Sequence, residues 1–113
     1  MIRALAACLT AATLLAAPAL AQAWPTRPVT MVVPFTPGTT SDVVGRTMAE
    51  HLGRALGQQV VVDNRAGAGG NIGAGVVAKA PPDGYTLLLA TTAQAATNPL
   101  MYATMSFDPA RDF

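Results

Sequence analysis

The chain has 113 residues, of which 51% are hydrophobic and 12% charged, and its formal net charge is +1. A charge this close to zero argues against binding to nucleic acid or to an anionic membrane surface, because both need clustered Lys and Arg. The chain has one cysteine, Cys8, and one histidine, His51, which is too few for a disulfide framework or a zinc centre. We therefore expect no metal and no cofactor.

The first 23 residues have the pattern of a cleaved export signal. Arg3 gives a positive start, residues 4–17 form an apolar stretch, and small residues precede two alternative cleavage points, after Ala21 or after Ala23. A proline and a glutamine interrupt the apolar region, which is too short for a membrane span of about 20 residues. The pattern predicts export to the periplasm.

Cys8 lies in a segment that resembles a lipoprotein signal, but too few residues precede it for a basic and an apolar region. We expect residues 1–23 to be removed and residues 24–113 to form the mature chain, a partial α/β lobe with six basic and six acidic side chains. The chain ends after an aromatic residue that should pack against further structure. A lobe of this size buries only about 60–65% of its surface and should be marginally stable.

The first predicted elements are a strand and a helix. Residues 29–33 form a β-branched run that Pro34 ends. Thr40 or Ser41 is expected to cap the following helix, and Gly57 is expected to end it. The apolar side chains of this helix recur on one face, which we expect to face the core: Val44, Met48, Leu52, Ala55 and Leu56.

A second strand is predicted over residues 59–62, and its continuous apolar run suggests burial on both faces. A glycine-rich turn follows the strand. After this turn we expect a helix over residues 71–80, with Asn71 as its N-cap and two prolines beyond its end.

A third strand is predicted over residues 85–90. Residues 93–98 predict a last helix that Thr91 or Thr92 caps, and Pro99 either kinks this helix or begins its next turn. The alternation of strands and helices predicts an α/β fold in which helices flank a parallel sheet.

Two polar segments are candidates for a ligand site. In an open parallel sheet ligands bind beyond the carboxyl ends of the strands, which selects residues 35–42 and 91–94. Both segments lack Lys and Arg, but their hydroxyls and backbone amides suit a carboxylate. The candidate ligand-binding residues are Phe35, Thr36, Gly38, Thr39, Thr40, Ser41, Asp42, Thr91, Thr92 and Ala93.

Some of these candidates have a second interpretation. Asp42 would repel a carboxylate, so we expect it to cap its helix or to meet an amino group on the solute. Phe35 is either a wall of the cleft or a core residue, and the threonines and Ser41 either cap helices or also donate to the ligand.

No set of side chains predicts catalysis. Residues 73–78 fit G-x-G-x-x-A but begin about ten residues after a strand, whereas a dinucleotide site needs this motif directly after one. Ser41 is not in a G-x-S-x-G turn, and His51 lies among polar neighbours where we expect solvent. No catalytic residue is therefore proposed.

Longer motifs resemble one known family in order and spacing. They occupy residues 24–28, 32–38, 56–62, 64–65, 67–73, 82–87, 98–99 and 108–113. These motifs are similar to those of Bug-type receptors, the substrate-binding components of tripartite tricarboxylate transporters. Pro37-Gly38-Thr39 departs from the family's usual Pro-Gly-Gly turn, which puts close backbone approach in doubt there.

The resemblance implies one lobe, truncated, of a hinged type II-like periplasmic binding protein. Such a receptor holds a small carboxylate between two lobes and presents it to cognate membrane transporter subunits. We expect an extracytoplasmic receptor for a dicarboxylate, a tricarboxylate or a related organic acid, and one lobe should bind it weakly or not at all. The alternatives are an exported α/β enzyme acting on a small organic acid and a non-transport sensor or interaction subunit.

Overall fold

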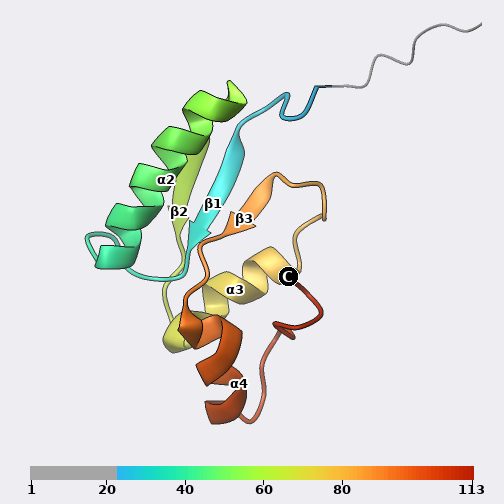
Figure 1. The fold of residues 1–113 in the computed structure, drawn as a ribbon. Helices are drawn as coiled ribbons and strands as arrows, with labels where there is room; N and C mark the ends of the chain where they lie inside the picture. Colours follow the sequence, from blue (N-terminus) through green and yellow to red (C-terminus); the bar gives the residue numbers. More distant parts are fainter. Residues whose placement is uncertain (1–22) are drawn as a thin grey trace, which may run out of the picture.

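A three-stranded parallel sheet forms the centre of the fold (Figure 1). The computed structural model describes residues 23–113, so the predicted export signal lies outside the described residues except for Ala23. Strand β1 (Val29–Val33) is central, with β2 (Val60–Asn64) on one side and β3 (Thr86–Leu88) on the other. The predicted α/β fold with a parallel sheet is thus confirmed.

The central strand carries most of the core, because every residue of β1 except Thr30 is buried. The second strand is different. It begins one residue later than predicted and extends to Asn64, and the side chain of Val61 is 44% exposed. The expected burial of this strand on both faces is wrong among the described residues, because β2 is an edge strand that pairs only with β1.

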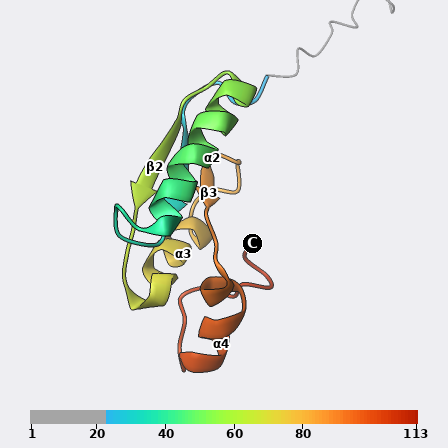
Figure 2. The ribbon, with the colours of Figure 1, turned by 60° about the vertical axis from the view of Figure 1, so that its left-hand side comes forward.

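Helix α2 (Thr40–Leu56) lies against β1 and β2 (Figures 1 and 2). Its N-cap is Thr39, whose side chain accepts a hydrogen bond from the backbone N–H of Asp42, so the prediction of Thr40 or Ser41 as cap is wrong. Gly57 has a φ of 67° and ends the helix as predicted.

The helix turns a different face to the sheet from the one predicted. Its buried residues are Asp42, Gly45 and Ala49, whereas Val44 and Met48 are 45% and 42% exposed. The reason is close packing, since a Cβ atom on Gly45 would lie only 2.7 Å from Val33 Cγ2. The small residues of α2 therefore face the sheet, and the predicted apolar face, including exposed Ala55 and half-buried Leu52 and Leu56, lies largely toward solvent.

A short 3-10 turn, η1 (Ala68–Gly70), leads into helix α3 (Asn71–Ala78), which lies against β1 and β3. The helix ends before residues 79–80, which were predicted to belong to it. Asn71 is not its N-cap: Gly70 occupies that position with a φ of 89°, and the Asn71 side chain accepts a hydrogen bond from Asn98 instead.

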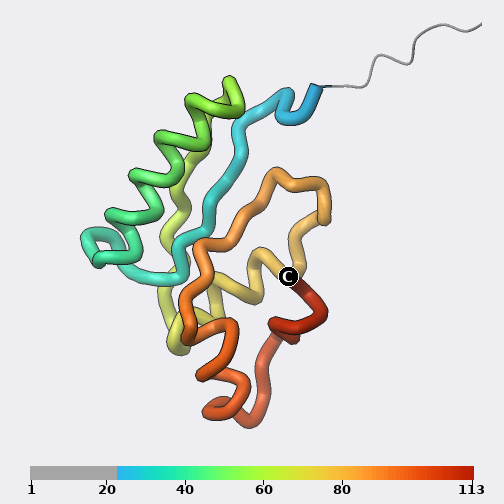
Figure 3. Tube along the Cα trace, in the orientation of Figure 1, coloured from blue at the N-terminus to red at the C-terminus, as the bar shows by residue number. Residues whose placement is uncertain are grey.

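Beyond β3, a π-helical turn η2 (Ala93–Thr97) continues into α4 (Asn98–Met101), and Pro99 lies in the first turn of α4. The chain then returns to α3 (Figure 3), where Phe107 is buried and Ser106 contacts Gly75. Between residues 23 and 113 no helix is long and apolar enough to cross a bilayer.

Candidate carboxylate site

The two segments predicted to bind a ligand follow two neighbouring strands of the sheet, β1 and β3. Because β1 pairs in parallel with β3, residues 35–42 and 91–94 both lie beyond the carboxyl edge of the sheet (Figure 2). Adjacent strands are about 4.8 Å apart, a span that a small acid can bridge.

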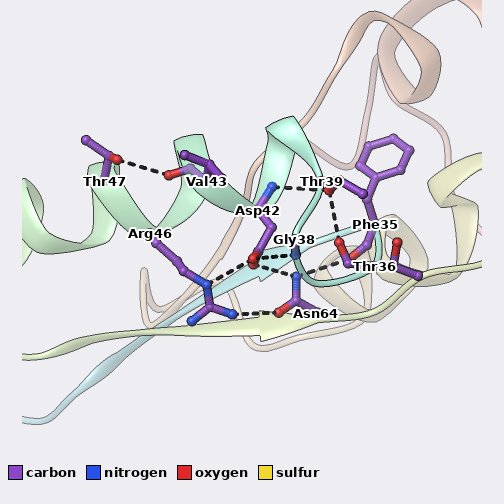
Figure 4. Close-up of polar contacts among 9 residues, drawn as sticks. All are labelled: Phe35, Thr36, Gly38, Thr39, Asp42, Val43, Arg46, Thr47 and Asn64. Carbon is purple, nitrogen blue, oxygen red and sulfur yellow. Dashed lines mark hydrogen bonds and ion pairs between the residues drawn. The ribbon is translucent and has the colours of Figure 1, made fainter.

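The β1–α2 loop is organised by the carboxylate of Asp42 (Figure 4). One of its oxygens accepts hydrogen bonds from the backbone N–H of Gly38, at 2.9 Å, and from Nε of Arg46, at 3.0 Å. The other oxygen accepts from Nδ2 of Asn64 at 2.9 Å. Asn64 also donates to the carbonyl of Phe35 at 3.1 Å, which fixes the start of the loop to the end of β2.

These donors keep Asp42 ionised although it is buried. The hydrogen bond from Arg46 is the largest cause, followed by those from Gly38 and Asn64, and together they lower the pKa of Asp42 to about 2. Arg46 also balances the charge of this carboxylate at 3.0 Å. Asp42 thus holds the loop in front of α2 in place, but the N-cap is Thr39, so the expectation that Asp42 caps the helix is wrong.

Other groups in the same loop are free to meet a ligand. Among residues 23–113, no hydrogen bond uses the backbone N–H of Thr40 or Ser41, or the hydroxyls of Thr36, Thr40 and Ser41. Thr36 and Thr40 are exposed and Ser41 is half-buried. The two amides lie in the first turn of a 17-residue helix, where the helix dipole is positive.

The departure from a Pro-Gly-Gly turn is accommodated without strain. Gly38 takes the left-handed conformation with a φ of 82°, whereas Thr39 is extended with a φ of −77°. Only the first of these positions needs a glycine. The hydroxyl of Thr39 donates to the carbonyl of Thr36 at 2.9 Å, and Phe35 is half-buried.

The second segment is held by Gln94, which was not among the candidate residues. The backbone N–H and the hydroxyl of Thr91 both donate to Oε1 of Gln94, and the N–H of Ala93 donates to Oγ1 of Thr91 at 3.3 Å. Thr92 is exposed and occupies the N-cap position of η2, but its side chain makes no capping hydrogen bond.

A third segment joins this edge of the sheet, because residues 67–71 follow the end of β2. The carbonyl of Gly69 accepts from Gln94 Nε2 at 2.8 Å and from Asn98 Nδ2 at 2.9 Å. Asn98 also donates to Asn71 at 2.7 Å. These polar contacts fasten the glycine-rich turn to η2 and α4.

The cavities formed by residues 23–113 include hollows of about 330, 380 and 390 Å³. The first lies between α3, β3 and residues 112–113, the second between α2 and β2, and the third on the outer face of α2. None of the three is lined by a predicted ligand residue.

No group of three or more metal-ligating side chains lies within the described range. His51 is exposed, with Nη2 of Arg54 3.2 Å from its Nδ1.

The fold and its polar sheet edge define the class of protein: the chain superposes on part of the α/β structure of periplasmic binding proteins. The model of the tripartite tricarboxylate transporter family receptor, TctC, matches residues 44–113. The chain belongs to this family. The family consists of binding proteins and not enzymes, which confirms that part of the prediction.

Three solved structures show the extent of the similarity. R. palustris Rpa4515 with adipate is 54% identical, with a TM-score of 0.74 over 77% of this chain and 29% of that one. The periplasmic binding protein BugD is 46% identical, with a TM-score of 0.76 over 80% and 30%. MatC from Rhodopseudomonas palustris with bound malate is 36% identical, with a TM-score of 0.76 over 80% and 31%. The chain spans only about a quarter to a third of the length of the curated relatives that it matches.

Proposed function

We propose that this chain is part of an extracytoplasmic solute receptor that binds a small carboxylate and delivers it to a tripartite tricarboxylate transporter. One observation carries the assignment. The amides of Thr40 and Ser41 are free at the start of α2, beyond the same edge of the sheet as the segment that follows β3, in a chain of the TctC family. Two relatives were solved with dicarboxylates, adipate and malate, which supports an acid of this kind.

The physical basis is an anion site without a cationic side chain at its mouth. Free N–H groups at a helix start point along the positive end of the dipole and donate well to a carboxylate. The negative charge of Asp42 opposes such a ligand, but Arg46 balances it and the oxygens of Asp42 already accept three hydrogen bonds. The carboxylate of the ligand therefore contacts the N–H donors rather than the carboxylate of Asp42.

In the whole receptor we propose a hinge mechanism. The solute gains contacts from two lobes only when they close, so its higher affinity for the closed state drives closure. Residues 24–113 would supply a partial lobe, and residues 1–23 would be the signal for export to the periplasm. The transporter's membrane subunits would receive the closed form.

An amide-correlation NMR titration of the chain with adipate tests this function. We expect saturable shifts of the amide signals of Thr40 and Ser41, with a dissociation constant in the millimolar range, because one lobe offers only part of the contacts. Adipamide, which has the same carbon skeleton without charge, serves as the control and should cause no such shifts. Equal shifts with adipamide, or adipate shifts only at distant residues, would contradict the proposal.

A proline variant sharpens the test. Thr40 is the first residue of α2, where proline fits the helix but removes the N–H, and extended Thr39 before it tolerates a following proline. Thr40→Pro should therefore keep the fold and weaken adipate binding about five-fold or more. Thr40→Ala, which keeps the amide, should bind more tightly than Thr40→Pro.

A further inference from the structure

Both hydrogen-bond donors of Thr91, its backbone N–H and its hydroxyl, donate to the same atom. Its backbone N–H lies 2.9 Å from Oε1 of Gln94, and its hydroxyl oxygen lies 2.8 Å from that same Oε1. Gln94 is only 1% exposed, so water does not compete for these bonds. These two bonds determine whether the Thr91 hydroxyl donates or accepts in its other hydrogen bonds.

The orientation of the Gln94 amide is set from both ends. A backbone N–H can only donate, so the side-chain oxygen of Gln94 must face Thr91. The carbonyl of Gly69 can only accept, and it lies 2.8 Å from the side-chain nitrogen of Gln94. Turning the amide over would bring two donors together at one end and two acceptors together at the other. The amide therefore has a single orientation.

This orientation determines the role of the Thr91 hydroxyl. The oxygen of Gln94 carries no proton, so the single hydroxyl proton of Thr91 is donated to it. Toward every other group, Oγ1 of Thr91 can only accept. One of its lone pairs receives the N–H of Ala93 at 3.3 Å, and the second has no partner among residues 23–113, where Thr91 is half-buried.

We infer that Thr91 is a specificity-determining residue that accepts a hydrogen bond from a hydroxyl or ammonium group on the solute. A carboxylate oxygen at this position would face an acceptor and would be disfavoured. The inference rests on the proposed function, and it assigns different chemistry to the two loops. The β1–α2 loop donates hydrogen bonds to the carboxylate, whereas the segment after β3 accepts a hydrogen bond from a donor group on the solute. The site therefore favours hydroxy or amino acids over plain dicarboxylates.

The test compares malate with succinate, which carry the same two carboxylates and differ by one hydroxyl group. Dissociation constants are measured by NMR titration of the chain, of Thr91→Val and of Thr91→Ser. The unmodified chain should bind malate about five-fold more tightly than succinate, as expected for one hydrogen bond. Thr91→Val should lose this preference, whereas Thr91→Ser and the control Thr97→Val, at an exposed threonine outside the candidate site, should keep it.

Equal affinities of the unmodified chain for the two acids would overturn the inference and leave the proposed function intact, whatever the stability of the variants. A malate preference that persists in folded Thr91→Val would also overturn it. If neither acid binds at millimolar concentration, the carboxylate site proposed on this chain fails, and the assignment of Thr91 fails with it.

Discussion

The carboxylate of Asp42 reaches back along its own chain to accept a hydrogen bond from the backbone N–H of Gly38 at 2.9 Å. The backbone N–H of Asp42 donates in turn to the hydroxyl of Thr39, the N-cap residue. This is a variation on the capping box, in which two residues three apart satisfy each other's free donors. The same bonds that begin α2 therefore shape the loop in front of it.

The pH dependence of stability should report on Asp42. Its pKa is lowered from 3.8 to about 2 in the folded chain, so its stabilising contribution is complete above about pH 4. The contribution is lost as the pH falls from about 4 through about 2, because the unfolded chain then binds the proton more readily. Urea unfolding across this range should show falling stability, and Asp42→Asn should flatten that fall.

Asp112 is the control for this measurement. Its pKa is also lowered, chiefly by the hydrogen bond from Arg111 and next by the backbone N–H of Asp108. Asp112→Asn should therefore remove only part of the acid dependence, and the Asp42 part should remain. An unchanged pH profile in Asp42→Asn would show that the carboxylate is not held as described.

Asn64 links the end of β2 to the β1–α2 loop, so its removal should destabilise the chain. Asn64→Ala loses the bonds to Asp42 and to the carbonyl of Phe35, and we expect a cost of about 2 kcal/mol. Asn64→Asp should cost more, because it places a second carboxylate beside Asp42. Denaturant titration measures both variants, and exposed Gln59→Ala serves as a control with little effect. Equal stability of Asn64→Ala and Gln59→Ala would refute this role.

The identity of the N-cap gives a direct comparison between neighbouring threonines. Thr39→Ala should destabilise α2 by about 1 kcal/mol, because the N–H of Asp42 loses its acceptor. Thr40→Ala should change the free energy of unfolding by less than about 0.5 kcal/mol, because its exposed hydroxyl has no partner among residues 23–113. The reverse order of the two effects, measured by thermal unfolding, would place the cap at Thr40.

Local patterns in the sequence were enough for the order of elements and for one helix end. The β-branched run of β1 and the left-handed glycine at Gly57 depend on neighbouring residues, and both were predicted correctly. The buried face of α2 could not be predicted in this way. It depends on the contact between Gly45 and Val33, and only the folded structure brings these residues together.

In the candidate site, too, some features could be predicted from local sequence and others depend on long-range contacts. Residues 35–42 and 91–94 could be selected because loops after parallel strands share one edge of a sheet. Asn64 and Asn98 were missed, since each acts on a partner more than 20 residues away. Gln94 lies in the selected segment but was not named as a candidate, because its bond to Gly69 joins residues 25 apart. The spacing of Asp42 and Arg46, four residues apart on a helix, was a local signal that would have identified their ion pair.

Gly70 should be the least replaceable of the left-handed glycines near the site, because it combines a φ of 89° with close contact to Gln94. A Cβ atom there would collide with Nε2 of Gln94 and lie 3.3 Å from Cβ of Pro34. Gln94 cannot yield without breaking its bonds to Gly69 and Thr91, so Gly70→Ala should cost roughly 3 kcal/mol or more. Gly38→Ala, with a φ of 82° and no atom within 4 Å of the new carbon, should cost only about 1–2 kcal/mol. Equal losses in denaturant unfolding would mean that backbone strain alone, and not the Gln94 contact, sets the need for glycine.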